Sequence, residues 1–139
     1  MKVFIDALSA RNGGGVTYIE NLIKKIPEKN ELEIYIVFQN SSDNEIYNHI
    51  KKNNRVSVYK TYFPTSNPLL RSLWQIFILP FILKKLKINI LFVPGGIVLT
   101  RTGKHIKLVT MFRNMLPFDN KQVARYPNRL FKLKILILK

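Results

Sequence analysis

The sequence has no cysteine and few acidic residues, and both absences narrow what the protein can be. Its 139 residues include 8 Asp and Glu, 2 His and no Cys. The lack of cysteine excludes disulfides, a thiol nucleophile and a cysteine-based zinc site, and it fits a reducing compartment. No carboxylate lies between Glu45 and Asp119, so paired-carboxylate hydrolysis is not expected there. No spacing typical of metal ligands occurs, and we expect His49 and His105 to be surface residues and no metal to be bound.

Long apolar runs are also missing. The apolar run at the start of Met1–Asp6 is too short for a signal peptide. The uncharged stretch 72–83 falls short of the roughly 18–20 residues that a bilayer span needs. A hydrophobic content of 47% nevertheless excludes a disordered polycation. The length predicts one compact domain, 1–139, with a single core.

The sequence is rich in positive charge, which is unevenly distributed. It has 23 Lys and Arg and a net charge of +15. Residues 1–45 hold seven of the acids and five bases, whereas residues 46–118 hold twelve bases and no acid. This asymmetry favours an anionic partner such as lipid headgroups, pyrophosphates or nucleic acid. The alternative is a solvated basic surface with no specific partner.

Short apolar runs of β type alternate with runs of helical spacing. The predicted strands are 3–5, 32–38, 56–59, 89–93 and 107–112, and the predicted helices are 16–26, about 43–52, about 68–86 and a C-terminal run from about 126. The first and the last two strands are expected to be buried. Pro80 is expected to kink the long helix. Strand–helix alternation predicts an α/β fold with a parallel sheet. The chain ends inside an apolar run, which indicates an interrupted domain or, alternatively, a β-edge or membrane-surface tail.

Two glycine turns follow predicted strands. Gly13, Gly14 and Gly15 lie between the first strand and its helix, where backbone N–H groups can approach an anion closely. The pattern is neither a Walker loop nor G-x-G-x-x-G. Gly95 and Gly96 follow another strand, and they either let the chain turn or line the same cleft. Ligands of open α/β sheets bind beyond the carboxyl ends of strands, so both turns are candidate binding segments.

A third segment of this kind follows the last predicted strand. Arg113 offers a rigid fork of donors for phosphate or carboxylate, and Asn114 suits a sugar hydroxyl. The alternative is that both residues cap a turn. Asp6, at the end of the first strand, could orient the glycine turn. These residues are candidates for binding, and no catalytic residue is assigned.

Taken in order, these segments resemble the N-terminal domain of a retaining GT-B glycosyltransferase of family 4. The matching segments are 1–6, 11–22, 73–75 with 79–80, 91–96 and 113–118, which together span nearly the whole chain. The resemblance implies a Rossmann-like domain on the acceptor side, facing a C-terminal donor domain with a Glu-x7-Glu motif that this chain lacks. Many members have His-Asp where this chain has Arg113 and Asn114.

The resemblance implies a nucleotide sugar as donor substrate, no cofactor, and a glycan or lipid-linked acceptor of cell-surface polysaccharide or lipopolysaccharide synthesis. It further implies a cytoplasmic, peripheral location at the inner face of an anionic membrane, with the helix that contains Trp74 and the segment 125–139 facing the bilayer. The chain alone is expected to be inactive, because donor and acceptor are then not held together.

Two other functions stay open on the sequence alone. A nucleic-acid-binding module would use the basic half, although no helix-turn-helix or RNP-like motif occurs and nucleic acid is not the expected partner. The second open function is that of a non-catalytic protein on a membrane surface. Continuation of this reading frame, or a neighbouring one, into a Glu-x7-Glu domain would distinguish the transferase from the latter.

Overall fold

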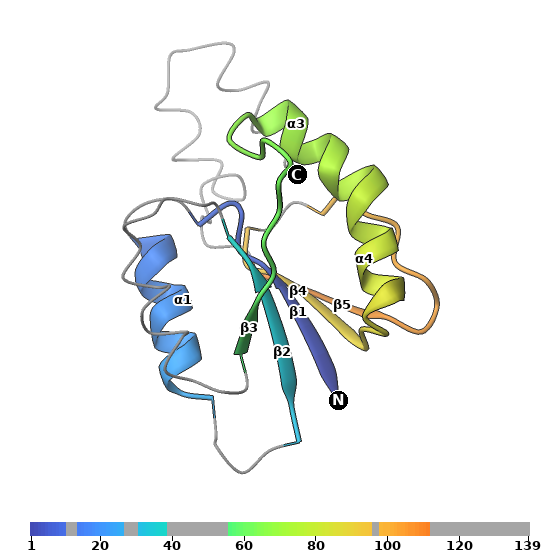
Figure 1. Cartoon of the computed structure of the whole chain (residues 1–139). Coiled ribbons are helices and arrows are strands. Elements are labelled where there is room, and N and C mark those ends of the chain that lie inside the picture. The colour runs from blue at the N-terminus through green and yellow to red at the C-terminus, as the bar shows by residue number, and fades with distance from the viewer. Residues whose placement is uncertain (11–13, 27–30, 39–55, 96–97, 112–139) are drawn as a thin grey trace, which may run out of the picture.

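The computed structural model describes residues 1–10, 14–26, 31–38, 56–95 and 98–111, which form a sheet with helices on both faces (Figure 1). The strands are β1 (Lys2–Asp6), β2 (Glu33–Val37), β3 (Val56–Val58), β4 (Ile90–Val93) and β5 (Lys107–Thr110). Their order in the sheet is β3-β2-β1-β4-β5, and each neighbouring pair is parallel. The predicted α/β class is confirmed, and the fold is Rossmann-like. The helix predicted at about 43–52 and the run from 126 lie outside the described residues.

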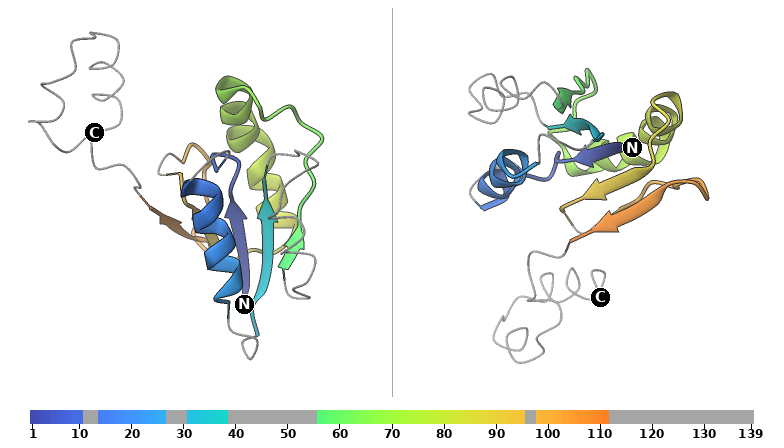
Figure 2. Two further views of the ribbon diagram at one scale, coloured as in Figure 1. Left: turned by 90° about the vertical axis from the view of Figure 1, so that its left-hand side faces the viewer. Right: turned by 90° about the horizontal axis from the view of Figure 1, so that it is seen from below.

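Helix α1 (Gly14–Lys24) covers one face of the sheet. Its apolar residues recur at helical spacing, so Ile19 and Ile23 are buried while Thr17, Asn21 and Lys24 face out. The helix begins two residues before Val16, the predicted start, and therefore includes two of the candidate glycines. Figure 2 shows α1 on the opposite side of the sheet from the second helical layer.

The second layer is one long helix with three segments: α3 (Pro68–Leu73), the π-helical η1 (Trp74–Ile78) and α4 (Leu79–Lys85). Asn67 caps it, because its side-chain oxygen accepts the Leu69 N–H at 2.9 Å. Pro80, where the sequence predicts a kink, directly follows a wider turn in which the Leu79 N–H bonds to the Trp74 carbonyl. Proline has no N–H and its ring crowds the carbonyl four residues earlier, so a π turn ahead of it relieves that contact.

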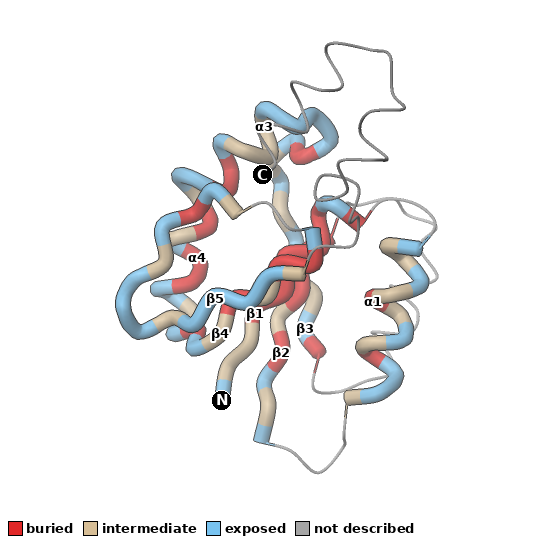
Figure 3. Tube along the Cα trace, turned by 180° about the vertical axis from the view of Figure 1, so that it is seen from behind, coloured by how far each residue is buried: buried red, intermediate tan, exposed pale blue. Residues whose placement is uncertain are grey.

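The two helical layers pack on alternate residues of the same strands. Ile5, Ile36 and Phe92 point to the α1 side, whereas Phe4, Val37 and Leu91 point to the long helix. Side chains of a strand alternate between faces, so a strand covered on both faces is apolar throughout. Figure 3 shows the resulting buried centre along the middle strands.

One expectation about burial is wrong. Strand β5 is exposed along its whole length, because it is the edge strand and has only β4 beside it. In the long helix Leu69, Phe77 and Phe81 are exposed, whereas Trp74 is fully buried, so only the outer side of this helix is free to face a bilayer, which stays a prediction. The buried face instead runs through Trp74, Leu79, Ile82 and Leu83. In the parts of the chain that the structure describes, no helix has both the length and the apolarity needed to cross a bilayer.

Candidate functional site

The strand order reverses between β1 and β4, which makes this the switch point of the sheet. Strand β1 pairs with β2 on one side and with β4 on the other, and Ile5 stands opposite Phe92. The chain therefore leaves β1 and β4 at the same edge of the sheet, where the strand order reverses. Ligands of open α/β sheets bind at such switch points, beyond the carboxyl ends of the strands.

The turns that leave these two strands touch each other. A Cβ built on Gly95 would lie 2.9 Å from the Ser9 Cβ and closer still to its hydroxyl oxygen. Glycine is therefore required at this position by the close approach of the β1–α1 turn. This contact joins the turn at Gly95 to the segment that leads from β1 to the first glycine turn.

The first glycine turn lies partly in the first turn of α1. Gly14 is exposed, and a Cβ placed on it would meet no atom within 4 Å. Gly14 and Gly15 open the helix, so their N–H groups belong to the end of α1 that attracts anions. Gly13 lies outside the described residues.

Of the other candidates, Gly96, Arg113, Asn114 and the acid Asp119 also lie outside the described residues. Strand β5 is parallel to β4, with Thr110 opposite Val93. The chain thus leaves β5 at the same sheet edge as it leaves β1 and β4. His105 is exposed, as predicted.

A buried carboxyl group anchors this edge of the sheet. Asp6 is 1% exposed and ends β1. Gln75 donates its side-chain N–H to Asp6 Oδ2 at 2.6 Å, and the Leu8 backbone N–H donates to Oδ1 at 3.1 Å. Burial raises the pKa of Asp6, and the bonds from Gln75 and Leu8 and the charge of Arg71 oppose that rise. Asp6 thus holds the chain that leads toward the glycine turn.

Sequence reasoning did not identify Ser9, Arg71 and Gln75 as parts of this edge. Arg71 lies in α3 and its guanidinium donates to the Leu8 carbonyl at 3.4 Å, while Gln75 lies in η1. A buried polar side chain needs a partner. A search for donors to Asp6 in the long apolar helix would have left two uncharged polar residues, Ser72 and Gln75.

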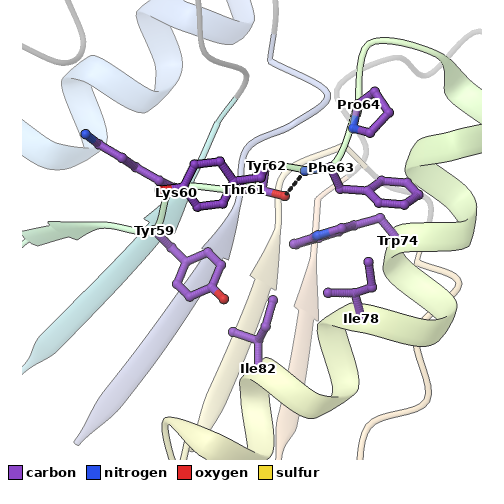
Figure 4. A pocket seen from close by; sticks show the side chains of 9 residues that line it. All are labelled: Tyr59, Lys60, Thr61, Tyr62, Phe63, Pro64, Trp74, Ile78 and Ile82. Atoms are coloured by element: carbon purple, nitrogen blue, oxygen red, sulfur yellow. Dashed lines mark hydrogen bonds between the residues drawn. The ribbon is translucent and has the colours of Figure 1, made fainter.

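A separate pocket of about 390 Å³ opens beside the carboxyl end of β3. Figure 4 shows Trp74, Ile78 and Ile82 of the long helix pointing toward the segment 59–64 that follows β3. Its remaining lining residues are Tyr59, Lys60, Thr61, Tyr62, Phe63 and Pro64. The pocket is apolar and aromatic, with a lysine at its edge, which suits an amphiphilic ligand better than a free nucleotide.

Comparison with known proteins adds no relative. No family model, curated protein or solved structure matches this chain. Within the described ranges no cluster of three or more His, Asp or Glu side chains forms that could hold a metal ion. The inference of function therefore depends on the sheet edge at β1 and β4 and on the sequence pattern that accompanies it.

Proposed function

We propose that this domain is the acceptor-side half of a nucleotide-sugar-dependent glycosyltransferase of the GT-B type, related to family 4. The single observation that supports it best is the contact between Gly95 and Ser9 at the switch point of a parallel sheet. It brings the turn after β4 against the turn that leads into α1. The order of motifs along the chain provides the second support.

In this proposal the two glycine turns bind and do not react. The N–H groups at Gly14 and Gly15 receive the negative charge of a phosphate. Gly95 has no side chain, so the turn after β4 leaves room for a sugar beside the β1–α1 turn. Arg113 and Asn114 follow β5 and supply donors to the same ligand. Asp6 is buried and bonded, so it acts by positioning the β1–α1 turn rather than by touching substrate.

Transfer requires a second domain in this proposal. The donor is a nucleotide sugar, which is a substrate, and no cofactor is involved. A C-terminal domain carrying a Glu-x7-Glu motif holds most of the donor. Without it the reactants are not held together, a loss that amounts to several kcal/mol of the barrier. The acceptor is a glycan or a lipid-linked glycan of cell-surface polysaccharide synthesis, and the site of action is the cytoplasmic face of the membrane.

The decisive experiment measures sugar transfer by this chain with and without such a donor domain, using a panel of nucleotide sugars and lipid-linked acceptors. We expect acceptor binding by the chain alone, and transfer only when both domains are present. Transfer by the chain alone at an ordinary enzymatic rate would show that it is not half of an active site.

A matched pair of variants tests the glycine turn within that assay. Gly14→Val places a side chain where phosphate would approach, and Gly103→Val makes the same change in open space before β5, at the opposite sheet edge. Loss of one hydrogen bond to a charged group weakens binding roughly tenfold or more. We expect that loss in G14V and none in G103V. Equal behaviour of the two variants would remove the glycine turn from the site.

A further inference from the structure

The outer side of the long helix carries an apolar stripe that no other described part of the fold covers. It consists of Leu69, Leu73, Ile76, Phe77 and Phe81, which we call the outer stripe. Leu69, Phe77 and Phe81 are 74%, 61% and 75% exposed. Figure 3 shows exposed positions alternating with buried ones along this helix. All five are exposed while Trp74, Leu79, Ile82 and Leu83 are buried, so the five lie together on the outer side of the helix.

The outer stripe continues into the pocket beside it. Ile78 and Ile82, each one position after a phenylalanine of the stripe, line that pocket together with Trp74. Tyr62, at the other edge of the pocket, is almost fully exposed. Isolated exposed apolar residues are ordinary, but a continuous apolar surface of this kind marks an interaction site.

The charges around the outer stripe have one sign. Lys84 and Lys85 are exposed and follow Phe81 at the same helical spacing, and Lys60 lies across the pocket. From residue 46 to residue 118 the sequence has no acid to oppose them. A helix with exposed Phe and Leu on one face and flanking lysines is typical of segments that lie in a membrane interface.

We infer that the outer stripe docks on an anionic lipid surface. Phe77 and Phe81 enter the boundary between headgroups and acyl chains, and Lys84 and Lys85 contact the phosphates. A second copy of this chain is a poorer occupant, because two molecules of net charge +15 repel each other. Nucleic acid is poorer too, since Leu69, Leu73 and Ile76 cannot stack on bases. The inference does not depend on sugar transfer.

The test uses the full chain and sedimenting vesicles of phosphatidylcholine with or without phosphatidylglycerol as the anionic lipid. We expect binding only with phosphatidylglycerol, and weaker binding as salt rises. The variant F77S/F81S removes exposed side chains and should leave the fold intact, which circular dichroism checks. Burial of a phenylalanine accounts for roughly tenfold or more in partitioning, so this variant should lose at least that factor.

Two matched controls separate the outer stripe from general stickiness and general charge. L108S/V109S removes exposed apolar residues from β5, and its vesicle binding should be unchanged. K84Q/K85Q should weaken binding roughly fivefold per lysine. K24Q/K25Q removes two exposed charges from the end of α1, on the opposite face of the sheet, and should have little effect.

Four results would overturn the inference. The first is absence of binding to anionic vesicles, and the second is an equal loss of vesicle binding in K84Q/K85Q and K24Q/K25Q. The third is a self-associated state that F77S/F81S dissolves without changing vesicle binding. The fourth is single-stranded oligonucleotide binding that this variant abolishes while vesicle binding persists. None of them affects the transfer assay, which can use detergent-dispersed acceptor, so failure here is distinguishable from failure of the proposed function.

Discussion

The buried carboxyl group of Asp6 couples the stability of the fold to pH. Burial raises its pKa above the ordinary value of 3.8, so the folded chain keeps the proton at pH values where the unfolded chain releases it. The contribution of Asp6 to stability is therefore complete below the unfolded pKa. This stabilisation is lost progressively as pH rises from the pKa of Asp6 in the unfolded chain through its higher pKa in the folded chain.

Asp6→Asn isolates this effect, because asparagine has a similar shape and cannot ionise. The Gln75 amide can turn its oxygen toward the new N–H₂, and the Leu8 N–H keeps an oxygen to bond. We expect the free energy of unfolding of D6N, relative to the native sequence, to increase as pH rises from 3 to 7. Denaturant titrations at several pH values measure it. A difference that stays constant, or that reverses sign, would show that the Arg71 charge and the hydrogen bonds outweigh burial.

The contact between Gly95 and Ser9 predicts a specific rescue. Gly95→Ala forces a methyl group against the Ser9 side chain, and overpacking of this kind costs about 1–3 kcal/mol. Ser9→Gly removes both the Cβ and the hydroxyl that the methyl group would meet. We expect G95A to lower the melting temperature and S9G/G95A to recover most of the loss.

The single variant S9G is the control for that cycle, because it measures the cost of a second flexible glycine alone. If S9G and G95A simply add, the two turns do not touch. The contact that supports the proposed function would then be wrong as well.

At the scale of the elements, substitutions of Gly14 at the start of α1 are expected to affect stability and binding in opposite directions. Gly14 is in the first turn of the helix and a methyl group there would meet nothing, so alanine should be better tolerated than glycine. Within a helix, alanine is favoured over glycine by roughly 1 kcal/mol, and less near its ends. We expect Gly14→Ala to raise the free energy of unfolding by about 0.5 kcal/mol, as measured by denaturant titration. A decrease would indicate that this glycine is needed for its backbone conformation.

The elements could be predicted from the sequence to the extent that local pattern determines them. Val3–Ile5, Ile34–Phe38 and Leu91–Val93 are apolar runs between breaks, and each is a strand near the predicted bounds. Asn67 and Pro68 likewise mark the start of the long helix correctly. Here capping and fixed φ act within a few residues, so no knowledge of the rest of the fold is needed.

Other features of the fold depend on tertiary contacts, which local sequence patterns do not contain. The long helix is apolar on most of its surface, so periodicity alone could not tell that Trp74 turns inward while Phe77 turns outward. The π turn at Trp74–Ile78 shifts the helical phase, and that shift follows from Pro80 and the sheet together. Burial of β5 depends on its place at the sheet edge, which composition does not encode. The bond from Gln75 to Asp6 spans 69 positions, and local patterns do not carry such pairs.

At the scale of the whole molecule, the net charge of +15 predicts opposite effects of salt on two properties. Charges of one sign repel in the compact state, and salt weakens this because the screening length falls from about 30 Å at 0.01 M to about 10 Å at 0.1 M. We expect the melting temperature to rise with NaCl over this range, while binding to anionic vesicles falls.

The variant K24Q/K25Q/K84Q/K85Q removes four exposed positive charges, so its melting temperature should depend less on salt than that of the native sequence. Exposed ion pairs act in the other direction. Glu33 raises the pKa of Lys2, and Lys2 lowers that of Glu33, across a contact of 2.9 Å that salt weakens. A melting temperature that falls with salt would mean that such pairs outweigh the general repulsion. The excess bases would then lie too far apart to repel one another strongly, and their combined attraction to an anionic surface would be weaker than proposed.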